Sequence, residues 1–194
     1  MNLPNKLTLM RVFLIPFFLL CMYWKFPFHY AAALVIFSAA SITDALDGKI
    51  ARSRNLVTNF GKFLDPLADK VLVLAALAVF VEIPDIRVGA VPLIIISARE
   101  FMVSGLRLLA ANSGIVVAAG MWGKLKTAFT MVAIITALVW LSACKDLSIN
   151  FPSAMISAVD NWVIPLLIWI STVLTIISGA IYLKGYWNLI DTDK

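Results

Sequence analysis

The residues of this sequence that could carry out chemistry are four aspartates: Asp44, Asp47, Asp65 and Asp69. The first two are three positions apart and the last two are four apart, so each pair is expected on one face of a helix. Oxygen ligands with no His or Cys nearby favour Mg²⁺, Mn²⁺ or Ca²⁺ over zinc. Two such ions about 4 Å apart form a clamp for displacement at a phosphoryl group. The spacing therefore predicts a site for divalent cations and phosphate chemistry.

Small and basic residues accompany the aspartates. Gly48 and Ala51 continue the first acidic face, and Gly61 begins the second. These small residues let two helices pack closely or leave room for a nucleotide against the backbone, and both roles can hold. Arg52 and Lys62 lie beside the acids, where they could neutralise a pyrophosphate or simply set the membrane topology.

The composition indicates which elements must hold these residues. The chain has 194 residues, of which 62% are hydrophobic and 14% charged, whereas a soluble domain is about a quarter charged. We therefore expect an all-α integral membrane protein with a single domain, 1–194. At about 20 residues per span, this length allows six transmembrane helices. Hydropathy places them at 7–25, 28–53, 59–82, 87–111, 121–144 and 160–185. Asn5 is expected to cap the first helix, and residues 145–159 to form a loop or interfacial segment.

The polar halves of the expected helices indicate a cavity and an orientation. An ionised carboxylate near the middle of a bilayer costs about 2.5–3.5 kcal/mol, so polar groups at that depth must face protein or water. With the N-terminus in the cytoplasm, the polar halves of helices two to five all lie on the cytoplasmic side. Only three of the 16 Lys and Arg residues then fall on the other side: Lys25, Arg87 and Lys145. The sequence therefore predicts a polar cavity that opens to the cytoplasm.

Residues 44–69 form one continuous pattern, Asp-x2-Asp-Gly-x2-Ala-Arg-x8-Gly-x3-Asp-x3-Asp. Every defined residue and every spacing matches the signature of the CDP-alcohol phosphatidyltransferases, and the chain resembles that family. Further segments are similar to members that make phosphatidylglycerophosphate: residues 5–11, 63–70, 98–107 and 123–127. The resemblance implies a homodimer with six transmembrane helices in the bacterial cytoplasmic membrane, with the N-terminus and the active site facing the cytoplasm.

The resemblance also implies a reaction and a role for each residue of the pattern. The phosphatidyl group of CDP-diacylglycerol would pass to sn-glycerol 3-phosphate, and CMP would leave. The four aspartates would bind two divalent cations, Mg²⁺ or Mn²⁺, and Asp69 would also be the general base. The implied CDP-binding residues are Gly48, Ala51, Arg52 and Gly61, with Lys62 beside them.

A phosphorylated acceptor needs cations in the cavity. The candidates are Arg99, Arg107, Lys124 and Lys126, with Thr8 and Arg11 at the rim. Arg99 and Arg107 are eight positions apart and share one broad helix face. Contact with lipid headgroups is the alternative role for Arg107 and Lys126. Glu100 either balances the charge of Arg99 or orients it.

Other functions fit the sequence less well. Within the resembled family, the basic residues favour a phosphorylated acceptor over serine, but they do not separate glycerol 3-phosphate from inositol phosphate, and phosphatidylglycerol is another candidate. A divalent-cation transporter would distribute its acids across the bilayer, whereas here they cluster on one side. The net charge of +5 is spread over all the helix ends, which favours topology and anionic lipid over nucleic acid as a partner.

Overall fold

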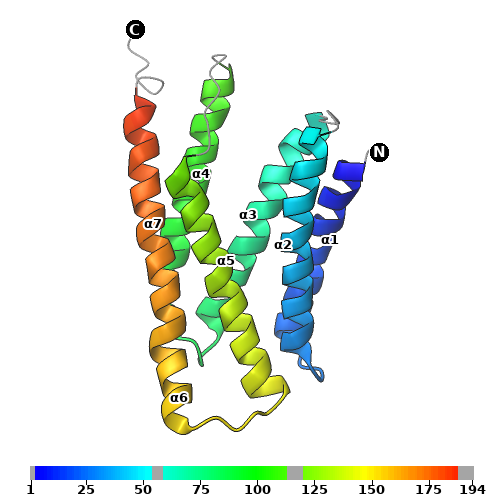
Figure 1. Ribbon diagram of the computed structural model, residues 1–194, viewed down its shortest axis with the longest axis vertical. Helices are drawn as coiled ribbons and strands as arrows, with labels where there is room; N and C mark the ends of the chain where they lie inside the picture. The colour runs from blue at the N-terminus through cyan, green and yellow to red at the C-terminus, as the bar shows by residue number, and fades with distance from the viewer. Residues whose placement is uncertain (1–2, 54–58, 113–119, 188–194) are drawn as a thin grey trace. The chain divides into compact units, whose positions relative to one another are not determined.

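The computed structural model describes residues 3–53, 59–112 and 120–187, and all regular structure in these ranges is helical (Figure 1). The α-helices in chain order are α1 (Leu3–Tyr23), α2 (His29–Ser53), α3 (Asn59–Glu82), α4 (Ala90–Asn112), α5 (Met121–Leu141), α6 (Ser153–Ala158) and α7 (Ile164–Gly185). Two π-helical segments follow α5 and α6: Ser142–Asp146 and Val159–Val163. The expected all-α fold is confirmed, and α2 and α3 end within a residue of their expected bounds.

The start of α1 differs from the expectation. Asn5 lies inside the helix, which begins at Leu3, so the prediction that Asn5 caps it is wrong. Pro4 explains the earlier start, because the N–H that proline lacks would have no partner in a first turn and its fixed φ suits a helix.

The segment before the last long helix is also more helical than expected. The loop expected at 145–159 ends at Pro152, whose carbonyl accepts a hydrogen bond from the N–H of Met155 at 2.9 Å. From there the chain is helical throughout Ser153–Gly185. The π-helical segment inside this run adds a residue to one turn without breaking the helix, and sequence periodicity does not reveal such an insertion.

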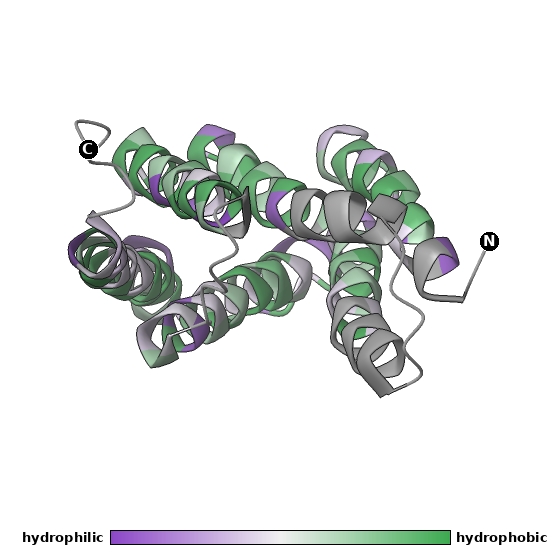
Figure 2. Ribbon diagram, turned by 90° about the horizontal axis from the view of Figure 1, so that it is seen from above, coloured by the Kyte–Doolittle hydropathy of each residue, from purple (hydrophilic) through white to green (hydrophobic). Residues whose placement is uncertain are grey.

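Several helices have the character of membrane spans. Met121–Asp146 and Ser153–Gly185 are long and apolar enough to cross a membrane, and Thr8–Tyr23 and His29–Thr43 are shorter apolar helices. Figure 2 shows that hydrophobic residues dominate most of the helices. Large apolar side chains such as Phe13 are exposed, which a soluble protein avoids over whole helix faces. These are the features of a membrane protein.

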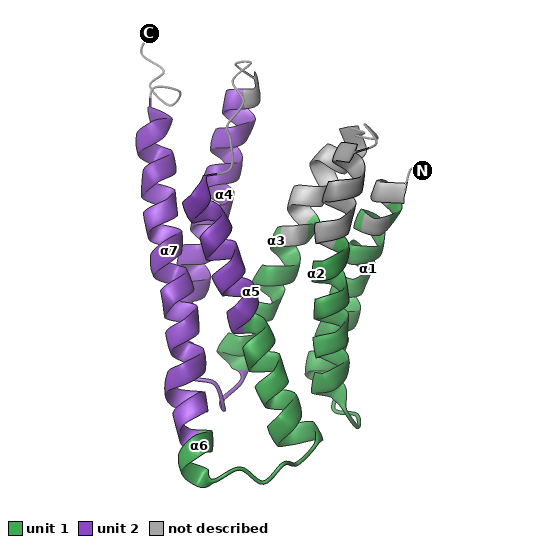
Figure 3. Ribbon diagram, viewed as in Figure 1, with its two compact units in different colours: residues 1–82, 134–156 green, residues 83–133, 157–194 purple. Residues whose placement is uncertain are grey.

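The chain divides into two compact units, which are described separately (Figure 3). Unit 1 consists of residues 1–82 and 134–156. In it, α1 packs against α2 and α3, which also contact each other. The rings of Phe18 and Phe37 are fully buried, and their centroids lie 5.9 Å apart. Ala40 on α2 is also fully buried. Its small side chain lets a neighbouring helix approach closely.

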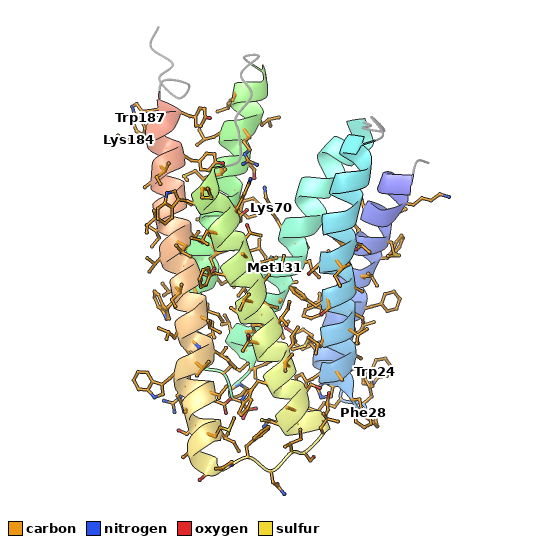
Figure 4. All side chains as sticks on the ribbon, in the orientation of Figure 1. Trp24, Phe28, Lys70, Met131, Lys184 and Trp187 are labelled. Carbon is orange, nitrogen blue, oxygen red and sulfur yellow. The ribbon has the colours of Figure 1, made fainter. Side chains whose placement is uncertain are left out.

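The turn between α1 and α2 marks one end of unit 1. The Asp146 carboxylate accepts a hydrogen bond from the backbone N–H of Ala31 at 2.7 Å and thereby ties the end of the α5 segment to α2. Trp24 and Phe28 project from the turn (Figure 4), as aromatic residues do at a membrane interface. A cavity of about 490 Å³ beside the turn is lined by residues 25–29, Lys145 and Asp146. The aspartates of α2 lie at the other end of that helix, so this cavity is not the candidate site.

Unit 2 consists of residues 83–133 and 157–194. Its α4 packs against α7, and the hydroxyl groups of Thr130 on α5 and Ser171 on α7 are hydrogen bonded. One face of α7 carries buried small and hydroxyl-bearing residues: Ser171, Thr172, Thr175, Ser178 and Gly179. Such a face allows close helix packing and brings polar groups to the centre of an apolar helix.

Candidate functional site

The four aspartates lie on two helices of unit 1 that contact each other. Asp44 and Asp47 are in the second half of α2, and Asp65 and Asp69 are in the first half of α3. Only residues 54–58 separate the two helices, so the acidic segments belong to the same end of unit 1. The two helices that carry the aspartates are therefore neighbours, as the sequence predicted.

The residues predicted to bind the metal ions and the nucleotide are ones whose side chains the structure does not describe. This applies to Asp44, Asp47, Gly48, Ala51, Arg52, Gly61, Lys62, Asp65 and Asp69. Their coordination and their contacts stay predictions.

Thr8 and Arg11 are buried on α1 in unit 1, with 1% and 0% of their surface exposed. The sequence placed them at the rim of the cavity, and the structure instead surrounds both with protein. A guanidinium is held in such a place only by charged or hydrogen-bonding neighbours. The burial of Thr8 and Arg11 does not test whether they bind the acceptor phosphate, so that role stays a prediction.

Arg99, Glu100 and Lys126 form a charged network in unit 2. The Glu100 carboxylate accepts a hydrogen bond from Arg99 Nη1 at 3.0 Å and also pairs with the Lys126 ammonium. Arg99 Nη2 donates to the Ser178 hydroxyl at 2.6 Å, which joins α4 to α7. Arg99 and Lys126 are only 9% and 7% exposed, and Arg99 Nε has no hydrogen-bond partner among the described residues. Glu100 therefore both balances and orients Arg99.

Tyr182 on α7 extends this network to Arg107. Its hydroxyl accepts hydrogen bonds from Arg107 Nη2 and from the backbone N–H of Gly120, both at 2.9 Å. The Arg99 and Arg107 guanidinium carbons lie 5.4 Å and 5.6 Å from the centre of the Tyr182 ring. These distances are within the range of a cation–π interaction. The tyrosine thus contacts both arginines that the sequence predicted for the acceptor.

Three of the four cations predicted for the acceptor therefore meet in unit 2. Arg99, Arg107 and Lys126 are connected through Glu100 and Tyr182. Lys124 lies on the first turn of α5 and is exposed. Its position two residues before Lys126 turns it about 200° away around the helix, so the two lysines face different sides.

Gly179 allows α4 to lie this close to α7. A Cβ atom at Gly179 would be 3.2 Å from Arg99 Cγ, which is tighter than ordinary van der Waals contact, and 3.4 Å from Met102 Cε. The side chain of Arg99 therefore runs directly over the backbone of Gly179.

Gly179→Val is expected to lower the melting temperature of the purified protein, because overpacking at such a contact costs about 1–3 kcal/mol. If Arg99 binds a phosphorylated acceptor, as the sequence predicts, the variant should also raise the KM for that acceptor by displacing Arg99. Gly105→Val is the matched control, since nothing lies within 4 Å of a Cβ at Gly105. Thermal unfolding in detergent measures the first effect. Equal melting temperatures for the two variants would contradict the close approach at Gly179.

The contribution of α7 is the part of the site that the sequence did not predict. Its pattern was nevertheless visible, because Ser171, Thr175, Ser178 and Tyr182 follow one another at positions i, i+4, i+7 and i+11. This spacing places four hydroxyl groups on one face of an otherwise apolar helix. The spacing does not show which of these hydroxyls bond to their own helix, as Thr175 does to the carbonyl of Ser171, and which bind another helix.

Comparison with known proteins identifies the family. The sequence profile of the CDP-alcohol phosphatidyltransferases matches residues 1–180. A CDP-diacylglycerol–glycerol-3-phosphate 3-phosphatidyltransferase of Bacillus subtilis (strain 168) is 42% identical over 205 aligned positions, which cover 100% of this chain and 99% of the relative. The enzyme of that name from Rickettsia bellii (strain RML369-C) is 37% identical, covering 95% of this chain and 94% of its own. A cardiolipin synthase (CMP-forming) of Oryza sativa subsp. japonica is 36% identical over 98% of this chain but only 59% of its own length. This chain therefore belongs to the CDP-alcohol phosphatidyltransferase family.

Proposed function

We propose that this chain transfers the phosphatidyl group of CDP-diacylglycerol to sn-glycerol 3-phosphate, which gives phosphatidylglycerophosphate and CMP. Family membership supports the donor, and full-length relatives named for this reaction support the acceptor. The observation that carries a phosphorylated acceptor is the network of Arg99, Arg107 and Lys126, whereas the choice of glycerol 3-phosphate among such acceptors rests on the relatives. Among the described residues this network contains a single carboxylate, so it has excess positive charge for a phosphate.

The four aspartates are proposed to hold two divalent cations, Mg²⁺ or Mn²⁺. The fit rests on the chemistry of the donors, because α2 and α3 contact each other and each carries two carboxylates. When bound, such ions stabilise the negative charge of a pyrophosphate and of the departing phosphate. Gly48, Ala51, Arg52, Gly61 and Lys62 are proposed to receive the CDP group.

Asp69 is proposed to accept the proton of the attacking hydroxyl on a carboxylate oxygen. The hydroxyl oxygen of the acceptor forms a bond to the phosphorus that carries diacylglycerol, the bond from this phosphorus to the bridging oxygen breaks, and CMP leaves. An ordinary Asp, with a pKa of about 3.9, is a weak base. Correct placement of the carboxylate and the hydroxyl must therefore supply most of the rate enhancement.

The acceptor is proposed to bind through its phosphate in unit 2. Arg99 Nε is buried and has no hydrogen-bond partner in the described part of the chain, so one donor of the more buried arginine of the network is unsatisfied. A cavity of about 300 Å³ touches this network at Tyr182, and its lining residues are Gly120, Ile181, Tyr182, Gly185 and Tyr186. Lys124, Thr8 and Arg11 remain further candidates for the acceptor.

The membrane arrangement is proposed to be six transmembrane helices, with the N-terminus and the polar cavity on the cytoplasmic side of a bacterial membrane. The positive-inside distribution of Lys and Arg supports this orientation. The long apolar helices support the spans. A homodimer is proposed from the family resemblance.

The test is an assay of the purified protein with CDP-diacylglycerol, labelled sn-glycerol 3-phosphate and Mg²⁺. We expect one CMP released for each phosphorylated lipid formed, and no product when EDTA removes the metal. Inositol phosphate and phosphatidylglycerol serve as alternative acceptors in parallel, the latter because the rice relative is a cardiolipin synthase. Product with one of these and none with glycerol 3-phosphate would overturn the acceptor. A flux of Mn²⁺ into liposomes without any transfer would favour a transporter.

A further inference from the structure

The Tyr182 hydroxyl lies where three segments of unit 2 meet. It accepts one hydrogen bond from Arg107 on α4 and one from the N–H of Gly120, the residue just before α5. A phenol oxygen has two acceptor positions, and both are used here. Tyr182 is 5% exposed, so its hydroxyl has little access to water and depends on these two donors.

The same side chain also organises both arginines through its ring. The Arg99 and Arg107 guanidinium groups each lie within 6 Å of the ring centre. Arg99 is additionally held by Glu100 and Ser178, whereas the hydrogen bond from Arg107 goes to Tyr182. Tyr182 therefore matters more for the position of Arg107 than for that of Arg99.

Fixing Arg107 has a direct consequence for ligand binding. Arg107 is the most exposed cation of the network, and a free arginine side chain has about 2 kcal/mol of rotamer entropy to lose on binding. A side chain that is already fixed loses less, so the ligand binds more tightly for the same contacts. The bond to Gly120 similarly fixes the start of α5, the helix whose Lys126 pairs with Glu100.

We propose that Tyr182 is a positioning residue of the acceptor site, and that its hydroxyl holds Arg107 and the start of α5 in place for the acceptor's phosphate. This inference rests on the proposed function, because it assigns the network to a phosphorylated acceptor. It predicts that loss of the hydroxyl weakens the binding of the acceptor and leaves the binding of CDP-diacylglycerol unchanged.

The test is Tyr182→Phe, which keeps the ring for both arginines and removes only the hydroxyl. We expect the KM for sn-glycerol 3-phosphate to rise about 10-fold, because two donors lose their acceptor. The turnover number and the KM for CDP-diacylglycerol should stay as in the wild type. Tyr23→Phe is the matched control, since its exposed hydroxyl donates to Glu82 at 2.7 Å within unit 1 and takes no part in the network. This control should change none of the three constants.

A double-mutant cycle separates positioning from general stability. If Tyr182 acts through Arg107, Tyr182→Phe should add little to the rise in KM that Arg107→Ala causes alone. Fully additive effects, an unchanged KM, or a parallel fall of turnover and melting temperature would each overturn the inference.

A binding measurement separates this inference from the reaction itself. sn-Glycerol 3-phosphate should raise the melting temperature of the wild type, and Tyr182→Phe should need about 10-fold more of it for the same rise. Stabilisation of the wild type without transfer would overturn the proposed reaction, while the shift in Tyr182→Phe would still decide the role of Tyr182. A wild type that glycerol 3-phosphate does not stabilise would overturn the positioning role.

Discussion

Asp69→Asn is expected to lower the turnover number for phosphatidyl transfer by about 10³-fold, because an amide cannot accept the proton of the attacking hydroxyl. The variant keeps the size of the side chain and one of its oxygens, so the binding of CDP-diacylglycerol should change far less than turnover. Release of CMP in the presence of Mg²⁺ measures the rate. Asp160→Asn makes the same change outside the acidic pattern and should retain full activity.

The dependence on Mg²⁺ distinguishes a base from a simple metal ligand. Two carboxylates 4 Å apart repel by about 4 kcal/mol at an effective dielectric constant of 20. Neutralising one of the four aspartates should therefore leave the metal-free protein at least as stable as the wild type. A melting temperature measured without metal thus checks that the fold is intact. If a higher concentration of Mg²⁺ restored most of the turnover, Asp69 would act only as a ligand and the proton would go elsewhere.

The sequence predicted the helices well because each has a strong local signal. Apolar segments bounded by short polar connections place α2 and α3 within a residue of their expected bounds, whereas α5 ends at Leu141, three residues before its expected end. The errors fell where local rules allow two outcomes. Pro4 is as compatible with a first helical turn as with a preceding loop. Residues 153–159 form helix because the chain after Pro152 continues directly into α7.

The candidate site was predictable only in part, for a physical reason. Charged residues in an apolar chain demand an explanation by themselves, so Arg99, Arg107 and Lys126 could be found from their type alone. Ser178 and Tyr182 could not, because a hydroxyl in an apolar helix usually bonds to its own backbone, as Thr172 does to the carbonyl of Ile168. Only packing against α4 shows that two of these hydroxyls bind arginines instead.

Arg99→Ala is expected to lower kcat/KM for sn-glycerol 3-phosphate by about 10²–10³-fold, since removing one member of a buried, hydrogen-bonded charge network costs roughly 2–5 kcal/mol. The loss should appear mainly in the KM for the acceptor, because CDP-diacylglycerol is proposed to bind through residues of α2 and α3. Arg99→Lys should recover only part of the activity. A lysine keeps the charge but lacks the planar fork with which Arg99 reaches Glu100 and Ser178 together.

Arg87→Ala is the matched control for Arg99→Ala. It removes the same side chain from an exposed position just before α4, and we expect no change in any kinetic constant. The acceptor assay should be run at several ionic strengths, because salt screens an exposed cation far more than a buried one. The effect of Arg99→Ala should therefore persist in high salt. A loss that disappears with salt, or one that affects both substrates equally, would mean that Arg99 acts on the membrane surface or on the fold rather than on the acceptor's phosphate.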